Sequence, residues 1–321
     1  MQEISIYDIG SIRIGQAENA EAGTGCTVFI YDEGMHAGLD VRGGGPSSRE
    51  TPLLSPLTAA QRIHSVVLSG GSSYGLSVAS GVMQYLREQN IGFDVGVTKV
   101  PLVVQSDLFD LTVGDPNVYP DEKMGYEAAR RAFEAPNYKD GNFGAGCGAT
   151  VGKICGMERC MKSGIGSYAV QLGDLKIGAV VALNSLGDIF DWKNGKRIAG
   201  MLTKDKTAFA DSPEEMCKSI EAVSNRFVEN TALGVIITNA HFHKASLCKI
   251  AGMGHDGFAR SIRPVHTSFD GDSIYAVSVG DVTADREVVG LLAAEVISEA
   301  IIRAVESADS AYGFPAAKDL D

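Results

Sequence analysis

The sequence predicts an α/β fold, of the α+β kind, in which a mostly antiparallel sheet system is covered by helices. Short apolar runs separated by glycine-rich turns fill the first third and the middle of the chain, and amphipathic segments with helical spacing lie between them. After residue 231 the order becomes strand, helix, strand, helix. Helices placed this way must cover the sheets to bury an apolar face. Apolar residues are 45% of the 321 residues, which is enough for a sizeable core.

The expected strands are short and mostly apolar. Five of them cover residues 4–15, 26–31, 64–69, 98–104 and 273–280. The stretch 166–191 alternates apolar and turn residues, which is typical of an antiparallel meander. Residues 232–238, ALGVIIT, are nearly all apolar, as expected for a strand that is covered on both faces.

The expected helices cover residues 73–89, 121–134, 211–223, 243–262 and 284–308. The helix at 211–223 has the strongest start signal. Ser212 at the N-cap, Pro213 at the first helical position and Glu215 at the third would form a capping box.

Charge, apolar runs and cysteine spacing narrow the range of possible functions. A formal charge of −12 argues against a nucleic-acid partner, because phosphate contacts need clustered Lys and Arg. The first residues lack the basic and apolar regions of a secretory signal, and no apolar run is long enough to span a membrane. Six cysteines without CxxC pairing are typical of reduced thiols. We therefore expect a cytoplasmic protein that acts on a small molecule or peptide, without a membrane partner.

Two motifs suggest cofactor sites, and their spacing argues against both. In GAGCGATVGK, Cys147 stands where a phosphate-binding loop needs glycine, and Ile154 follows Lys153 where Ser or Thr is needed. A structural glycine-rich turn or a site amine at Lys153 remain as interpretations. His241 and His243, with Cys248 and His255 downstream, match no zinc motif, so a polar loop is the better interpretation. No metal and no cofactor are expected.

Three other polar residues are candidates for a catalytic site. Asp270 and Asp272 lie two residues apart before a strand, so extended backbone would project them to the same side. Their mutual repulsion would raise the pKa of one of them. From the spacing alone, however, an Asp-Gly turn that faces solvent is the favoured interpretation. Asn184 follows an apolar strand, where its amide either caps a turn or stabilises an oxyanion.

Thr231 adds a hydroxyl at the mouth of a central strand. On one interpretation it is a β-branched residue that merely opens the strand. On the other interpretation it is a nucleophile that becomes an N-terminus. A terminal α-amine titrates at about pH 8 and can therefore act as the base, which a peptide nitrogen cannot do. The set of hydroxyl, amine, paired carboxylates and amide fits the second interpretation.

The chain resembles the P1/S58 peptidase family, which includes D-aminopeptidase/esterases, β-aminopeptidases and nylon-oligomer hydrolases. The matching stretches are VRGGGPSSRE, LSGGSSYGL, VYPDEKMGYEA, GAGCGATVGK, GDLKIGAVVALNSLGD, ENTALGVIITNA and RPVHTSFDGDSIYAVSVG. The resemblance implies one catalytic domain, 1–321, with the αββα sandwich of the D-aminopeptidase/ornithine-acetyltransferase type. It further implies self-cleavage between Asn230 and Thr231, into 1–230 (α chain) and 231–321 (β chain), and a tetramer of processed protomers.

The resemblance also implies roles for individual residues. Thr231 matches the nucleophile, Asp270 and Asp272 the carboxylates that order it, and Asn184 the oxyanion-hole amide. Lys153 matches a lysine of the nylon-oligomer hydrolases. The position of an active-site tyrosine in those hydrolases is occupied here by Phe109, so one hydroxyl donor is absent.

The expected function is therefore a self-processing amidohydrolase or aminopeptidase with an N-terminal threonine. It would release small aminoacyl groups from amides, peptides or esters. Two alternatives are an acyl transferase similar to ornithine acetyltransferase, and an unprocessed binding protein that keeps the glycine-rich pocket.

Overall fold

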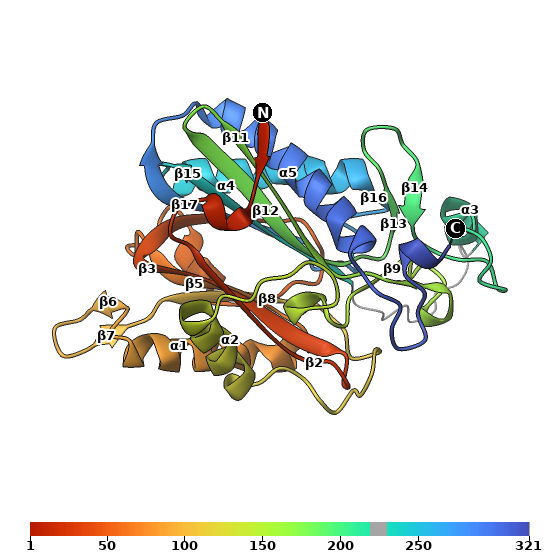
Figure 1. Ribbon diagram of the computed structural model, residues 1–321, viewed down its shortest axis with the longest axis horizontal. Helices are drawn as coiled ribbons and strands as arrows, with labels where there is room; N and C mark the ends of the chain where they lie inside the picture. The colour runs from red at the N-terminus through yellow and green to blue at the C-terminus, as the bar shows by residue number, and fades with distance from the viewer. Residues whose placement is uncertain (219–229, 321) are drawn as a thin grey trace.

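The computed structural model describes residues 1–218 and 230–320, and these form four layers (Figure 1). Two β-sheet layers pack face to face, and a pair of helices covers the outer face of each layer. Apolar clusters fill the space between the two sheet layers and the space under each helix pair. The αββα sandwich expected from the sequence is thus confirmed.

The first sheet layer holds the strand that begins with Thr231. Its order is β1 (Gln2–Ile4), β11 (Ile165–Leu172), β12 (Leu175–Asn184), β15 (Thr231–Ala240), β17 (Ser273–Val282) and the C-terminal part of β3 (Thr24–Val41). Neighbours are antiparallel except β15 and β17, which are parallel. β15 is therefore central and buried on both faces, as its apolar sequence predicts.

The second sheet layer continues from the same long strand. The N-terminal part of β3 pairs with β2 (Arg13–Asn19) and β5 (Ile63–Ser69), and β5 pairs in parallel with β8 (Val103–Asp107), beside β4 (Ser47–Arg49). The 18-residue β3 thus links the two layers. Its last part, from His36 to Val41, pairs with β17 in the first layer.

The helices lie directly on the sheets. They are α1 (Val78–Glu88), α2 (Glu122–Glu134), α3 (Ser212–Lys218), α4 (Lys244–Ser261) and α5 (Arg286–Glu306). α1 and α2 cover the second layer, and α4 and α5 cover the first (Figure 1). A Cβ at Gly166 in β11 would lie 2.3 Å from the carbonyl oxygen of Ala300 in α5, so the close approach of this helix to the strand requires glycine there.

Short strands within the connecting segments form small sheets outside the two layers. They are β6 (Phe93–Asp94) with β7 (Lys99–Val100), β9 (Thr150–Val151) with β10 (Met161–Lys162), and β13 (Asp188–Phe190) with β14 (Arg197–Ala199) and β16 (Ile262–Arg263). The strand pair β9–β10 and the three-stranded group lie at the end of the sandwich where β15 begins (Figure 1).

Three strand predictions need correction. The stretch 4–15 is not one strand, because a 3-10 turn at Ile6–Asp8, capped by the Ser5 side chain, separates β1 from β2. The stretch 98–104 is divided at Pro101, which cannot donate a ladder hydrogen bond. In 166–191, β11 and β12 form the expected hairpin, but β13 leaves the layer to pair with β14 and β16.

The capping box predicted for the helix at 211–223 is also wrong. The helix begins at Ser212, and the Asp211 carboxylate is the cap, because its Oδ1 accepts the backbone N–H of Glu214 at 2.9 Å. Asp and Ser are equally good N-cap residues, so adjacent candidates leave the boundary open by one position. Residues 219–223 of the prediction lie outside the described residues. The other predicted helices are confirmed, although the helix at 73–89 begins with a 3-10 turn.

Within the described part of the chain, no helix combines the length and the apolar character that a membrane span requires.

Candidate active site

Strand pairing brings the predicted site residues together at one end of the first sheet layer. Thr231 is the first residue of β15, and it lies opposite Asn184, the last residue of β12. Asp272 directly precedes β17, on the other side of β15. The side chains of Thr231, Asn184, Asp270, Asp272 and Lys153 are all buried, with 1–3% of each residue exposed.

The two carboxylates point into the protein. Asp272 accepts the backbone N–H of Ala232 through Oδ1 at 2.8 Å and that of His266 through Oδ2 at 3.1 Å. Asp270 accepts the backbone N–H of Thr267 at 2.7 Å. The alternative of an Asp-Gly turn that faces solvent is therefore wrong. Asp272 holds the second residue of β15, next to the Thr231 hydroxyl, in a fixed position.

Both carboxyl groups have a raised pKa. Burial and the neighbouring charge of Asp270 raise the pKa of Asp272 to about 7. Burial also raises the pKa of Asp270, and this is opposed by hydrogen bonds from Thr267 and by the positive charge of Lys153. A carboxyl group with a pKa of about 7, such as Asp272, can take up or release a proton near neutral pH, and perturbed groups of this kind cluster at catalytic sites.

Asn184 and Lys153 form a second part of the site. The Lys153 ammonium donates to the Asn184 side-chain oxygen at 2.7 Å and to its carbonyl oxygen at 3.1 Å. The backbone N–H of Thr150 also donates to that side-chain oxygen, at 3.1 Å. The Asn184 amide nitrogen donates to the carbonyl of Phe109 at 2.8 Å, and an amide has a second N–H. Burial lowers the pKa of Lys153 to about 7, so a neutral amine is accessible there.

The peptide bond before Thr231 is held by two hydrogen bonds. The Thr231 hydroxyl donates to the carbonyl oxygen of Asn230 at 2.6 Å, and the backbone N–H of Gly271 donates to the same oxygen at 2.7 Å. The hydroxyl therefore lies beside a carbonyl group that a second donor polarises. A donor aimed at this oxygen stabilises the negative charge that develops when the carbonyl carbon is attacked.

Sequence analysis missed Gly271 and the glycines that support it. The stretch RGGGP packs its backbone on the Asp270–Asp272 loop, with the N–H of Gly45 donating to the Asp270 carbonyl at 2.8 Å. A Cβ at Gly43 would lie 2.3 Å from that carbonyl oxygen. The available signal was the glycine cluster itself, which marks close approach of backbone without naming the partner.

Sequence analysis also missed a histidine pair behind Asp272. The backbone N–H of His266 donates to Asp272. Nε2 of His266 lies 2.9 Å from Nδ1 of His255, and Nε2 of His255 lies 3.1 Å from the carbonyl oxygen of Asp40. His255 is thus remote from the His241–His243 loop with which the sequence grouped it. Burial lowers the pKa of both rings, which keeps them neutral near pH 7.

Replacing Gly271 by alanine should slow cleavage at Asn230–Thr231 at least about tenfold, because small misplacements of reacting groups cost large factors in rate. The added Cβ would lie 2.6 Å from the Thr231 hydroxyl oxygen and would displace it. Gel electrophoresis of newly made protein over time measures the rate. Gly252→Ala in α4 is the control, because its φ is not positive and the nearest atom to an added Cβ is the end of the Asp40 side chain, at 3.3 Å. Equal rates for Gly271→Ala and the unchanged protein would show that cleavage does not depend on this position of the Thr231 hydroxyl.

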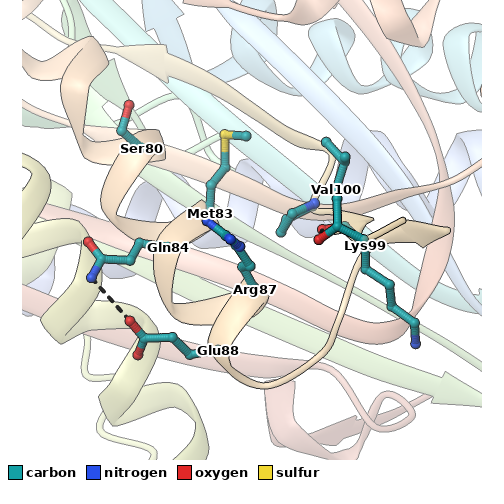
Figure 2. Close-up of a pocket in the computed structure, with 9 residues that line it drawn as sticks. Ser80, Met83, Gln84, Arg87, Glu88, Lys99 and Val100 are labelled. Atoms are coloured by element: carbon teal, nitrogen blue, oxygen red, sulfur yellow. Dashed lines mark hydrogen bonds between the residues drawn. The ribbon is translucent and has the colours of Figure 1, made fainter. Parts of the chain in front are cut away.

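A sizeable cavity among the described residues lies away from this site. It has a volume of about 940 Å³ and lies between α1 and the β6–β7 hairpin, with Met83, Arg87 and Lys99 in its lining (Figure 2). None of the predicted site residues lines this cavity.

Comparison with known proteins places this geometry in a family. The model of peptidase family S58 matches residues 5–318. An uncharacterized aminopeptidase of Mycobacterium leprae is 34% identical, over 97% of this chain and 92% of the relative. A 6-aminohexanoate-oligomer endohydrolase of an Agromyces species is 28% identical, over 94% of this chain and 86% of the relative.

The fold is shared with solved structures at lower identity. The L-aminopeptidase D-Ala-esterase/amidase of Ochrobactrum anthropi, described as a variant of the Ntn hydrolase fold, aligns with a TM-score of 0.70 and 16% identity over 97% of this chain and 88% of that one. A β-aminopeptidase of a Burkholderia species aligns with a TM-score of 0.64 and 18% identity, over 95% and 86% of the two chains. Together with the family match across nearly the whole chain, these comparisons establish that the protein is a hydrolase of peptidase family S58.

Proposed function

We propose that the protein cleaves itself between Asn230 and Thr231 and then uses Thr231 as an N-terminal nucleophile to release small aminoacyl groups from amides, peptides or esters. The observation that carries the proposal is the Asn230 carbonyl, which lies between the Thr231 hydroxyl at 2.6 Å and the Gly271 N–H at 2.7 Å. The names of relatives, aminopeptidases and an amide-oligomer hydrolase, support the substrate class.

Self-cleavage proceeds as an N-to-O acyl shift. The Thr231 hydroxyl oxygen attacks the Asn230 carbonyl carbon, the C–N bond breaks, and the nitrogen takes up a proton to become the Thr231 amine. Water then hydrolyses the Asn230–Thr231 ester. The Gly271 N–H stabilises the oxyanion during attack. The products are chains of 230 and 91 residues.

Substrate hydrolysis uses the amine that cleavage creates. The Thr231 hydroxyl attacks the substrate carbonyl, its α-amine takes the proton and passes it to the leaving amine, and water releases the acyl group. The substrate carbonyl takes the place left by the Asn230 carbonyl. There the Gly271 N–H and the second N–H of Asn184 serve as oxyanion donors. Asp270 and Asp272 orient the hydroxyl and the amine.

Intact mass spectrometry of the purified protein, followed by a panel of small aminoacyl amides, tests the proposal. Two chains that end at Asn230 and begin at Thr231, together with release of free amine from the amides, are the expected result. An uncut chain that binds the amides without hydrolysing them would instead support the binding-protein alternative. Transfer of an acetyl group to an amino acid, without net hydrolysis, would support the acyl transferase.

The rate of self-cleavage should rise with pH through about 7. Before cleavage Thr231 has no α-amine, so the proton must pass to a neighbouring base. Asp272 and Lys153 both have a pKa of about 7 and accept a proton only when deprotonated. Cell-free translated chain, chased at pH values from about 5.5 to about 8.5, should cleave about tenfold faster per pH unit at the acid end and reach a plateau at the basic end. A rate that does not change with pH would exclude both groups as the base.

Phe109 should limit hydrolysis of long nylon-type oligomers. Its carbonyl holds Asn184, but its ring offers no hydrogen-bond donor. We expect short aminoacyl amides to be better substrates, and Phe109→Tyr to raise the kcat/KM ratio of 6-aminohexanoate oligomers to short amides. Phe109→Leu is the control, because it changes the ring without adding a hydroxyl. If the tyrosine and leucine variants have the same substrate profile, the hydroxyl is not the determinant.

We also propose that processed protomers work in the cytoplasm as a tetramer. All six cysteines lie in the described part of the chain, and none of them forms a disulfide, although Cys155 and Cys217 are exposed. Thiols of this kind suit a reducing compartment. Light scattering of the processed protein measures the assembly, and a monomer would contradict the proposal.

A further inference from the structure

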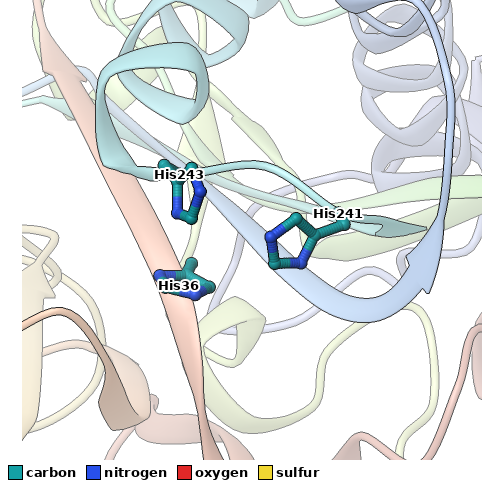
Figure 3. A group of neighbouring side chains, drawn as sticks. All are labelled: His36, His241 and His243. Atoms are coloured by element: carbon teal, nitrogen blue, oxygen red, sulfur yellow. The ribbon is translucent and has the colours of Figure 1, made fainter.

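Three histidines lie close together beyond the end of β15 that is opposite to Thr231 (Figure 3). His36 lies in β3, His241 directly follows β15, and His243 is the N-cap residue of α4. One ring nitrogen of each lies within 4.8 Å of those of the other two. The ring centroids are 5.1–5.6 Å apart, and every pair of rings is nearly perpendicular.

We propose that His36, His241 and His243 bind a first-row divalent metal ion such as Zn²⁺. Imidazole is a preferred ligand of Zn²⁺, and three histidines leave an open fourth position for water. Metal–nitrogen bonds of about 2.0–2.1 Å require ligand nitrogens about 3.4 Å apart in a tetrahedral site. The rings must therefore close by about 1.5 Å, which the exposed side chains of His241 and His243 allow by rotation.

Groups behind the rings favour metal binding. Nδ1 of His36 lies 3.0 Å from the carbonyl oxygen of Gln61, and donation to that oxygen leaves Nε2 with a lone pair for the metal. Nδ1 of His241 lies 3.8 Å from the carboxylate of Asp281, which can orient it in the same way.

The charges around the cluster partly compensate one another. Glu33, Asp281 and Arg62 line the small cavity, of about 70 Å³, into which His36 and His241 also project. The N-terminus of α4 adds partial positive charge beside His243. Two carboxylates oppose one guanidinium and one helix end, so the site is not strongly positive.

The place of the cluster indicates a structural role. Thr231 and Ala240 are the first and last residues of β15, so the cluster lies roughly 30 Å from the nucleophile. His36 belongs to residues 1–230, and His241 and His243 belong to residues 231–321. If the chain is cut as proposed above, a bound metal joins the two products across β3 and β15. This linking role rests on the proposed cleavage, whereas metal binding itself does not.

Titration calorimetry with ZnCl₂ on metal-stripped protein tests the site. One Zn²⁺ should bind per chain, in the unchanged protein and equally in uncut Thr231→Ala. His241→Asn and His243→Asn should each weaken Zn²⁺ binding at least about tenfold. Removing a residue that only hydrogen-bonds a ligand already lowers metal affinity by about that factor, and loss of the ligand itself should cost no less. His36→Asn should do the same, but His36 is buried, so the two exposed positions keep the test independent of folding. Cys155→Ser and Cys217→Ser are controls for thiol binding and should bind like the unchanged protein.

The outcomes separate the two ideas. Binding that survives both His241→Asn and His243→Asn, or is lost only in the cysteine variants, would overturn the metal site. If Thr231→Ala binds Zn²⁺ but is cut like the unchanged protein, the metal site stands and the proposed nucleophile fails. Zn²⁺ should raise the melting temperature without changing kcat/KM, and a large change in kcat/KM would contradict a structural role.

Discussion

Replacing Thr231 by alanine should leave one uncut chain of 321 residues without hydrolase activity. The Thr231 hydroxyl is the group that lies beside the Asn230 carbonyl, at 2.6 Å from its oxygen. Without that oxygen no ester forms, so no α-amine is released to act as the base. Loss of the nucleophile of a hydrolase costs on the order of 10⁶ in kcat. Intact mass and amide hydrolysis measure the two losses separately.

Two companion proteins show whether one atom serves both reactions. Thr231→Ser keeps the oxygen and should retain measurable cleavage and hydrolysis. Residues 1–230 co-expressed with a second chain that begins at Thr231 should bypass cleavage and still give active enzyme. If Thr231→Ala were cut after Asn230, or hydrolysed amides, the nucleophile would lie elsewhere and the proposed mechanism would be wrong.

The elements that the sequence predicts well are those whose signal is local. Residues 232–238 are apolar throughout, and the structure buries them as part of the central strand β15. The helix predicted at 121–134 begins at its Asp121 cap and ends as expected. Predictions were wrong where two local signals compete, as Asp211 and Ser212 do for one N-cap. They are also wrong where strand pairing decides which sheet a strand joins. β13 is a strand, as predicted, but it pairs with β14 and β16 outside the two main layers.

The candidate site shows the same division. A hydroxyl, two carboxylates and an amide can be named from the sequence, because their residue types suit one chemistry. Their contacts depend on strand register, which sets Asn184 opposite Thr231 although the two are far apart in the chain. No local pattern connects Gly45 with the Asp270 carbonyl, or His36 with His241. Such contacts arise only when distant segments fold against one another, so sequence analysis identified the reacting groups and missed the backbone that positions them.

Asp272 should matter more to turnover than any other charged residue of the site. Its carboxylate holds the Ala232 N–H at 2.8 Å and so fixes the strand beside the nucleophile. Asparagine keeps the shape but removes the negative charge that would face the Thr231 amine. We expect Asp272→Asn, and to a smaller degree Asp270→Asn, to lower kcat/KM at least about a hundredfold, in the range of acid–base effects.

The measurement should use the co-expressed chains 1–230 and 231–321, so that a failure of self-cleavage cannot imitate a loss of catalysis. Asp140→Asn is the matched control, because Asp140 is a partly buried carboxylate with a raised pKa that accepts hydrogen bonds from Tyr138 and Ser167. It should lose stability and keep its kcat/KM. If Asp272→Asn and Asp270→Asn both retain normal kcat/KM at an unchanged melting temperature, the carboxylates only support the loop. Thr231 would then rely on its own amine and on Lys153, the remaining group of the site that can exchange a proton near pH 7.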